Sequence, residues 1–197
     1  MSRQLRLSGS HAARSAEPSR RTDETLRGDG RPSPRLRNLM PTGAAPPPHT
    51  EAELARLLAT VRQGLRHGTT VTIGHSRDAD SADAADAFAA AWREYGHVTA
   101  VVDWPEDAAS WLRQARRLTA GAPDGWVIAA SAEGFAQLSR RLVYSTDWTA
   151  RRTFAFGSLA DPRCVALAGV GVLDGLRGAT SDGKGWVVRG EVVLGAD

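Results

Sequence analysis

Short runs of apolar residues alternate with amphipathic stretches between Thr70 and Thr180. The apolar runs lie at 71–74, 98–102, 126–130 and 153–157. Continuous runs of this length are typical of strands that are buried on both faces, as the strands of parallel sheets are. Between the runs, apolar residues recur at the three- and four-residue spacing of helices. The alternation predicts an α/β fold, a three-layer sandwich whose mainly parallel sheet is covered by helices.

Capping residues and glycines locate the ends of several elements. Thr50 and Glu53 form the pattern of a capping box, which predicts a helix over 51–67. Ser81 or Asp83 is predicted to cap the next helix, and Ser131 the helix after the third strand. The remaining predicted elements are a helix that begins at Pro105–Asp107, a short helix at 162–168, a fifth strand at 176–180 and a C-terminal hairpin of strands 186–189 and 191–194.

Composition separates residues 1–49 from the rest of the chain. They contain seven of the ten prolines, and nine arginines against four acidic residues. Few large apolar residues accompany them, so this segment cannot bury enough surface to offset the entropy of ordering. We therefore expect a disordered Arg/Pro-rich tail at 1–49 and one α/β ligand-binding-like domain at 50–197. The tail has no Phe, Trp or Tyr for stacking on bases, so no specific nucleic-acid partner is expected.

No apolar stretch in the sequence resembles a transmembrane helix, and the first 30 residues lack the apolar core of a signal peptide. We expect a cytoplasmic protein from the sequence as written, and an extracytoplasmic one if the true start lies upstream. The single cysteine, Cys164, excludes an intramolecular disulfide and a cysteine-based zinc motif.

The sequence offers no complete catalytic set. Cys164 lies in a predicted helix without a residue that would favour its thiolate. The third strand ends in Ala-Ala-Ser131, without the carboxylate that a phosphoacceptor domain needs at that place. The acidic loop 75–83 lacks the central glycine and the distal glutamate of a calcium loop. We therefore expect no enzyme activity, no catalytic residue, no metal site and no cofactor.

Five segments together carry a resemblance to a known family. They are 81–96 (SADAADAFAAAWREYG), 107–117 (with LRQAR), 125–131 (GWVIAAS), 154–162 (FAFGSLADP) and 173–180 (LDGLRGAT). In this order the segments resemble the second lobe of type I periplasmic-binding proteins, the branched-chain amino-acid-binding branch of ABC-transporter substrate-binding proteins. The resemblance spans about 110 residues and consists of pattern more than of a diagnostic motif.

The resemblance implies a non-catalytic lobe that binds or senses a small, polar, amino-acid-like ligand at the carboxyl ends of its strands. By this resemblance the ligand-binding residues are His75, Ser76, Arg77, Trp104, Ser131, Glu133, Ser158 and Asp161. Members of the family enclose the ligand between two lobes, whereas residues 1–69 supply only the tail and one helix. The alternative is therefore a protein-interaction module that pairs with a partner lobe, or with a second copy of itself, and has no small ligand of its own.

Overall fold

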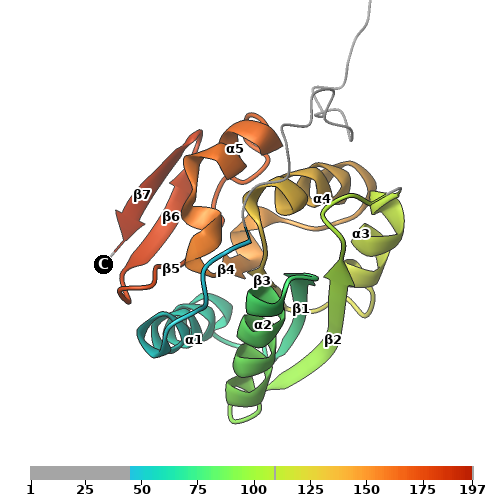
Figure 1. Ribbon diagram of the computed structural model, residues 1–197. Helices are drawn as coiled ribbons and strands as arrows, with labels where there is room; N and C mark the ends of the chain where they lie inside the picture. The colour runs from blue at the N-terminus through green and yellow to red at the C-terminus, as the bar shows by residue number, and fades with distance from the viewer. Residues whose placement is uncertain (1–44, 109, 197) are drawn as a thin grey trace, which may run out of the picture.

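The computed structural model describes residues 45–108 and 110–196. The predicted disordered tail lies outside the described residues over 1–44, so the structure does not test it there. Residues 45–49 of the predicted tail are described, and they lie against the domain (Figure 1).

The described residues form a seven-stranded sheet with helices on both faces. The helices are α1 (Glu51–Leu65), α2 (Ala79–Trp92), α3 (Trp111–Thr119), α4 (Ala132–Ser145) and α5 (Pro162–Ala168), with short 3₁₀ turns η1 (Ala150–Arg152) and η2 (Gly157–Ala160). The strands are β1 (Thr70–Ser76), β2 (His97–Trp104), β3 (Gly125–Ala129), β4 (Thr153–Ala155), β5 (Arg177–Ala179), β6 (Gly185–Arg189) and β7 (Val192–Ala196). Strand order is β2-β1-β3-β4-β5-β6-β7.

The first five strands run parallel, and β6 and β7 add an antiparallel hairpin at one side. Gly190 occupies the hairpin turn with φ of 60°, a left-handed conformation that glycine adopts at little cost. This arrangement confirms the predicted fold class, a mainly parallel α/β sheet with a C-terminal hairpin.

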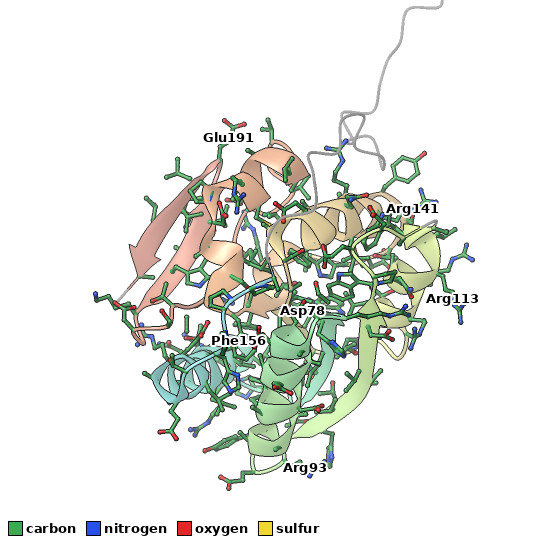
Figure 2. The ribbon with its side chains drawn as sticks, viewed as in Figure 1. Asp78, Arg93, Arg113, Arg141, Phe156 and Glu191 are labelled. Carbon is green, nitrogen blue, oxygen red and sulfur yellow. The ribbon has the colours of Figure 1, made fainter. Side chains whose placement is uncertain are left out.

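Two hydrophobic clusters hold the three layers together. Helices α1 and α2 cover one face of the sheet, where Phe88 and Trp92 pack against strand residues such as Ile73. Helices α3, α4 and α5 cover the other face, which contains Phe135 and Leu118 (Figure 1). Charged side chains, Arg93, Arg113 and Glu191 among them, project outward around the rim (Figure 2).

Helix caps agree with the sequence at two of three predicted positions. The hydroxyl of Thr50 accepts a hydrogen bond from the Glu53 N–H, and that of Ser131 accepts one from Gly134. At α2, however, the predicted caps Ser81 and Asp83 are wrong, because Asp78 is the capping residue and its carboxylate accepts from the Ser81 N–H. The Asp78 carboxylate is one turn closer to the strand, where the first unpaired N–H groups lie.

The third helix begins later than predicted. Pro105–Asp107 form a loop, and α3 begins only at Trp111. The reason is a competing set of partners for Glu106, whose carboxylate accepts hydrogen bonds from the hydroxyls of Ser76 and Ser131. These bonds hold the segment across the end of the sheet instead of in a helical turn.

Trp148, in the loop between α4 and η1, is buried. Its ring packs between Trp126, at 6.5 Å, and Phe135, at 6.4 Å between ring centroids.

Within the described part of the chain, none of the helices is both long and apolar enough to cross a lipid bilayer.

Candidate functional site

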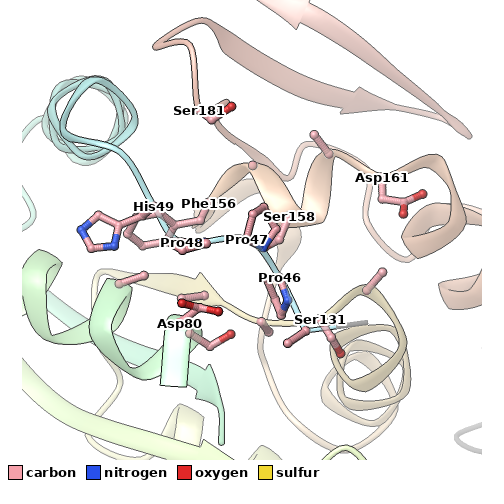
Figure 3. Close-up of a pocket in the computed structure, with 18 of the residues that line it drawn as sticks. Pro46, Pro47, Pro48, His49, Asp80, Ser131, Phe156, Ser158, Asp161 and Ser181 are labelled. Carbon is pink, nitrogen blue, oxygen red and sulfur yellow. The ribbon is translucent and has the colours of Figure 1, made fainter. Parts of the chain in front are cut away.

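A cleft of about 570 Å³ opens at the carboxyl edge of the parallel strands. Its walls are the start of α2, the β3–α4 junction, the segment after β4, the residues just after β5, and residues 45–49 (Figure 3). Open parallel sheets bind ligands at this edge, and the volume lies within the range of roughly 300–1,000 Å³ that is usual for small-molecule sites. The cleft is the candidate functional site of the described domain.

Residues 45–49, which we call the proline strap, form one wall of the cleft. Figure 3 shows the strap passing between Asp80 and Ser131 on one side and Ser158 and Ser181 on the other. Its prolines have no N–H to donate, so the strap adds apolar surface without adding hydrogen-bond donors.

The strap is attached to the domain at its carboxyl end. The His49 ring packs edge-on against Phe156, with 5.9 Å between ring centroids. Next to it, the Thr50 hydroxyl donates a hydrogen bond of 2.6 Å to the carbonyl oxygen of Ser181. These contacts hold the last residues of the strap beside the segments that follow β4 and β5.

Four carboxylates line the cleft. They belong to Glu53, Asp80, Glu133 and Asp161. Glu53 is only 4% exposed, and its Oε1 accepts a hydrogen bond of 2.5 Å from the Gly157 N–H. Asp80 lies in the first turn of α2 and makes no hydrogen bond or ion pair with any described residue.

Arg163 is the only arginine or lysine among the described residues that line the cleft, and acids already neutralise it. Its guanidinium lies 2.7 Å from an Asp161 oxygen and 3.8 Å from a Glu133 oxygen. The hydrogen bond from Arg163 holds the pKa of Asp161 below its usual value, even though partial burial acts in the opposite direction. Asp161 therefore remains ionised throughout the physiological range.

Ser81 contributes a buried hydroxyl without a partner. The residue is 2% exposed and lines the cleft, and its Oγ makes no hydrogen bond within the described residues. An unsatisfied buried hydroxyl is costly unless water or a ligand completes it. Sequence reasoning treated Ser81 only as a helix cap and so missed it as a site residue.

Four of the eight predicted site residues lie together in the cleft. Ser131 and Glu133 come from the start of α4, Ser158 from η2, and Asp161 from the residue before α5. The structure thus joins the loops after the third and fourth strands, as expected for neighbouring parallel strands.

The other four predicted residues do not line this cleft. Ser76 is fully buried; its Oγ donates to Glu106 at 2.5 Å and accepts from the Ser131 N–H at 3.1 Å. His75 is within β1, and its Nδ1 lies 2.7 Å from the Ser76 carbonyl oxygen. The predicted ligand contact by Trp104 is wrong for this structure, because its side chain is 0% exposed.

Trp104 is buried because it ends β2 facing the helices, where it packs against Gly74. A Cβ at Gly74 would lie 2.8 Å from the Trp104 ring, so the ring fills the space that a side chain would take.

Arg77 is also engaged within the domain. Its Nε donates to Asp103 Oδ2 at 2.5 Å, and this hydrogen bond lowers the pKa of Asp103. Arg77 and Asp103 belong to the β1–β2 side of the sheet, whereas the cleft lies toward β3, β4 and β5. The prediction that Arg77 meets a ligand carboxylate therefore has no support in this geometry.

The described residues contain no group of three or more His, Cys, Asp or Glu side chains that could hold a metal ion. Cys164 is buried, and burial raises the pKa of its thiol far above the ordinary value, with the nearby acids acting in the same direction. Its nucleophilic thiolate is therefore strongly disfavoured at neutral pH.

No family model matches the sequence, and comparison with curated proteins finds no relative. Solved structures do match. A candidate branched-chain amino acid ABC transporter from Silicibacter pomeroyi superposes with a TM-score of 0.57 at 19% identity, over 68% of this chain and 35% of that one. An extracellular ligand-binding receptor from Rhodopseudomonas palustris HaA2 superposes with a TM-score of 0.57 at 16% identity, over 67% of this chain and 36% of that one.

The chain has the fold of part of a type I periplasmic-binding protein. A third match, with a TM-score of 0.52 and 14% identity, is the solute-binding protein of an ABC transporter from Rhodopseudomonas palustris BisB5 in complex with 3,4-dihydroxybenzoic acid. It covers 64% of this chain and 36% of that one. The chain thus spans little more than a third of the length of these proteins.

Proposed function

We propose that this domain is a non-catalytic lobe that binds or senses a small, polar, amino-acid-like molecule, as a part of ABC-transporter substrate-binding proteins does. The observation that carries the proposal is the cleft of about 570 Å³ at the carboxyl edge of the sheet. Several protein segments converge there, and they present hydroxyl and carboxylate groups beside apolar side chains.

The chemistry of the cleft supports binding more than catalysis. The Ser131 hydroxyl donates to the Glu106 carboxylate, and neither Ser131 nor Ser158 is hydrogen-bonded to a histidine within the described residues, so the serine–histidine pair of a typical hydrolase is not formed there. His75 and Cys164 do not line the cleft. The two R. palustris proteins, named as a ligand-binding receptor and a solute-binding protein, are consistent with a binding role.

The cleft is partly open to solvent, so one lobe alone covers only part of a ligand. Affinity for a ligand in isolation is therefore expected to be weak, because buried ligand surface and fixed polar groups both contribute to it.

A titration followed by amide NMR tests the proposal. The full chain is titrated with a panel of amino acids and small acids, and shifts are expected at 80–84, 131–134, 156–161 and 180–181. Shifts confined to the hairpin of β6 and β7, or no shifts with any compound, would contradict the proposal.

The second candidate is an interaction module that pairs with a partner lobe or with another copy of the chain. The observation that favours it is the outer edge of β7, where Val192 is 56% exposed and Leu194 46% exposed. An uncovered apolar edge strand is able to pair with another chain. Sedimentation of the full chain over a range of concentrations tests self-association, and V192K/L194K should abolish it.

A further inference from the structure

The charge of the cleft identifies the chemical class of ligand that it accepts. Four carboxylates face one guanidinium among the lining side chains, and that guanidinium is already paired with Asp161 and Glu133. Each acid also lies at or near the start of a helix, where the dipole offsets about half an elementary charge. The four carboxylates and the one guanidinium together carry a net charge of about −3, and the four helix N-termini offset about two of these charges. The cleft therefore stays negative by about one charge, so it attracts cations and repels anions.

Two adjacent residues of α2 have polar groups without partners. Asp80 makes no hydrogen bond or ion pair within the described part of the chain. Ser81, next to it, is a buried residue in the lining of the cleft, and its hydroxyl lacks a partner among the same residues. An ammonium group has donors for a carboxylate and for a hydroxyl oxygen together, so it would complete both.

The place where a ligand carboxylate would bind is filled from within the chain. The hydroxyls of Ser76 and Ser131 at the ends of β1 and β3 both donate to the carboxylate of Glu106. Glu106 thus occupies the position that a ligand acid would need in order to reach these donors. Arg77, the exposed cation that follows β1, is paired with Asp103.

The remaining surface excludes a bare metal ion and favours an organic body. No three acidic, histidine or cysteine side chains of the described residues are close enough together to hold a metal. The prolines of the strap, Phe156 and several alanines provide apolar walls beside the acids. A compact hydrocarbon group would bury its surface there.

We propose that the cleft selects small organic amines, with the cationic nitrogen at Asp80 and Ser81 and an apolar body against the proline strap, and that it does not hold a ligand carboxylate. This inference rests on the proposed binding function and narrows its ligand class. An amino acid binds through its ammonium group alone, and the corresponding acid without an amine binds worst.

Three probes that share one 3-methylbutyl group separate these classes: 3-methylbutylamine, leucine and 4-methylpentanoate. Calorimetry and amide NMR on the full chain should show the amine binding at least about tenfold more tightly than the carboxylate, with affinity falling as salt rises. Binding of 4-methylpentanoate at the cleft amides as tightly as the amine would overturn this inference and leave the proposed function standing. Absence of shifts at those amides with all three probes would overturn both.

Variants of α2 locate the amine. Asp80→Asn is expected to lower the affinity for 3-methylbutylamine about tenfold, which is the loss expected when one charge-assisted hydrogen bond is removed. Asp86→Asn removes the same charge from the exposed side of the same helix and should leave the affinity unchanged. Ser81→Ala should lower the affinity for the amine about threefold. An unaltered affinity in Asp80→Asn, with its amide spectrum native-like, would contradict the assignment.

Discussion

The carboxylate of Glu53 accepts a hydrogen bond from the backbone N–H of Gly157, with 2.5 Å between Oε1 and the nitrogen. The bond joins the first turn of α1 to η2, 104 residues further along the chain. It also places a nearly buried acid in the wall of the cleft. One side chain therefore contributes both to the stability of this edge of the sheet and to its charge.

Replacing Glu53 tests the first of these roles. Glu53→Ala should lower the free energy of unfolding by about 1–3 kcal/mol, because the Gly157 N–H loses its partner in a part-buried place. Glu53→Gln keeps an acceptor oxygen and should cost less. Urea unfolding measures both, with exposed Glu51→Ala as the control, for which a few tenths of a kcal/mol are expected. Equal losses at 51 and 53 would contradict the role of this bond.

Glu106 should act as a clamp across the ends of β1 and β3. Glu106→Ala leaves the hydroxyls of Ser76 and Ser131 without their acceptor, and about 1–3 kcal/mol of stability should be lost. Asp107→Ala removes an exposed acid from the same loop and should be nearly neutral. Chemical denaturation gives the values, and a neutral Glu106→Ala would show that the clamp adds nothing to stability.

Trp92 is expected to be a core residue without a ligand role. Its side chain is 1% exposed and stacks on Phe88, with 5.8 Å between ring centroids. Trp92→Ala should cost about 3–5 kcal/mol, the usual range for emptying a large aromatic site. Tyr95→Ala, in the turn that follows α2, where the side chain is 40% exposed, is the control and should cost much less. Thermal unfolding distinguishes the two.

Acid should weaken the domain through Asp124. Hydrogen bonds from the Thr70 hydroxyl and from the N–H groups of Thr70 and Thr69 hold the pKa of Asp124 below its ordinary value of 3.8. The ionised carboxylate therefore stabilises the folded state fully above that ordinary value. This contribution is lost as pH falls through the lowered pKa of the folded state.

Urea unfolding at pH 7, 4 and 3 checks the Asp124 prediction. The wild-type protein should lose little stability between pH 7 and 4 and more between 4 and 3. Asp124→Asn should be less stable than the wild type at pH 7 and should lose less stability between pH 4 and 3. The exposed Asp86→Asn variant should show the same pH dependence as the wild type. Parallel curves for Asp124→Asn and the wild type would contradict the assignment.

Removing residues 1–48 should leave the domain folded. His49 and Thr50, which contact Phe156 and Ser181, are retained in this variant. The thermal midpoint should change by about 4 °C or less, since only Ala45 and the three prolines of the strap leave the described domain. Removing residues 1–44 is the matched control that keeps the strap. Amide shifts should differ between the two variants around Phe156 and Ser181, and a much larger fall in the midpoint would show that the removed segment packs on the domain.

The sequence by itself determined the layers of this protein. Continuous apolar runs such as 126–130 and amphipathic stretches such as that around Phe88 depend on local periodicity, so they predict strands, helices and the parallel sheet without any knowledge of contacts. The loops after the first, third and fourth strands were predicted to gather at one edge of the sheet. Ser131, Glu133, Ser158 and Asp161 do lie together there, whereas His75, Ser76 and Arg77, which end or follow β1, do not line the cleft.

Only the tertiary structure decided which groups remain available at that edge. Glu53 resembled a capping-box residue and Glu106 a first-turn acid, but both accept hydrogen bonds from distant segments. Local patterns cannot show such pairings, because they join residues that are far apart in the chain. The same holds for Trp104, which lies in the core, and for Ser81, whose hydroxyl is left without a partner within the described residues. The folded chain thus engages Ser76 and Arg77 internally and leaves Asp80 and Ser81 available for a ligand.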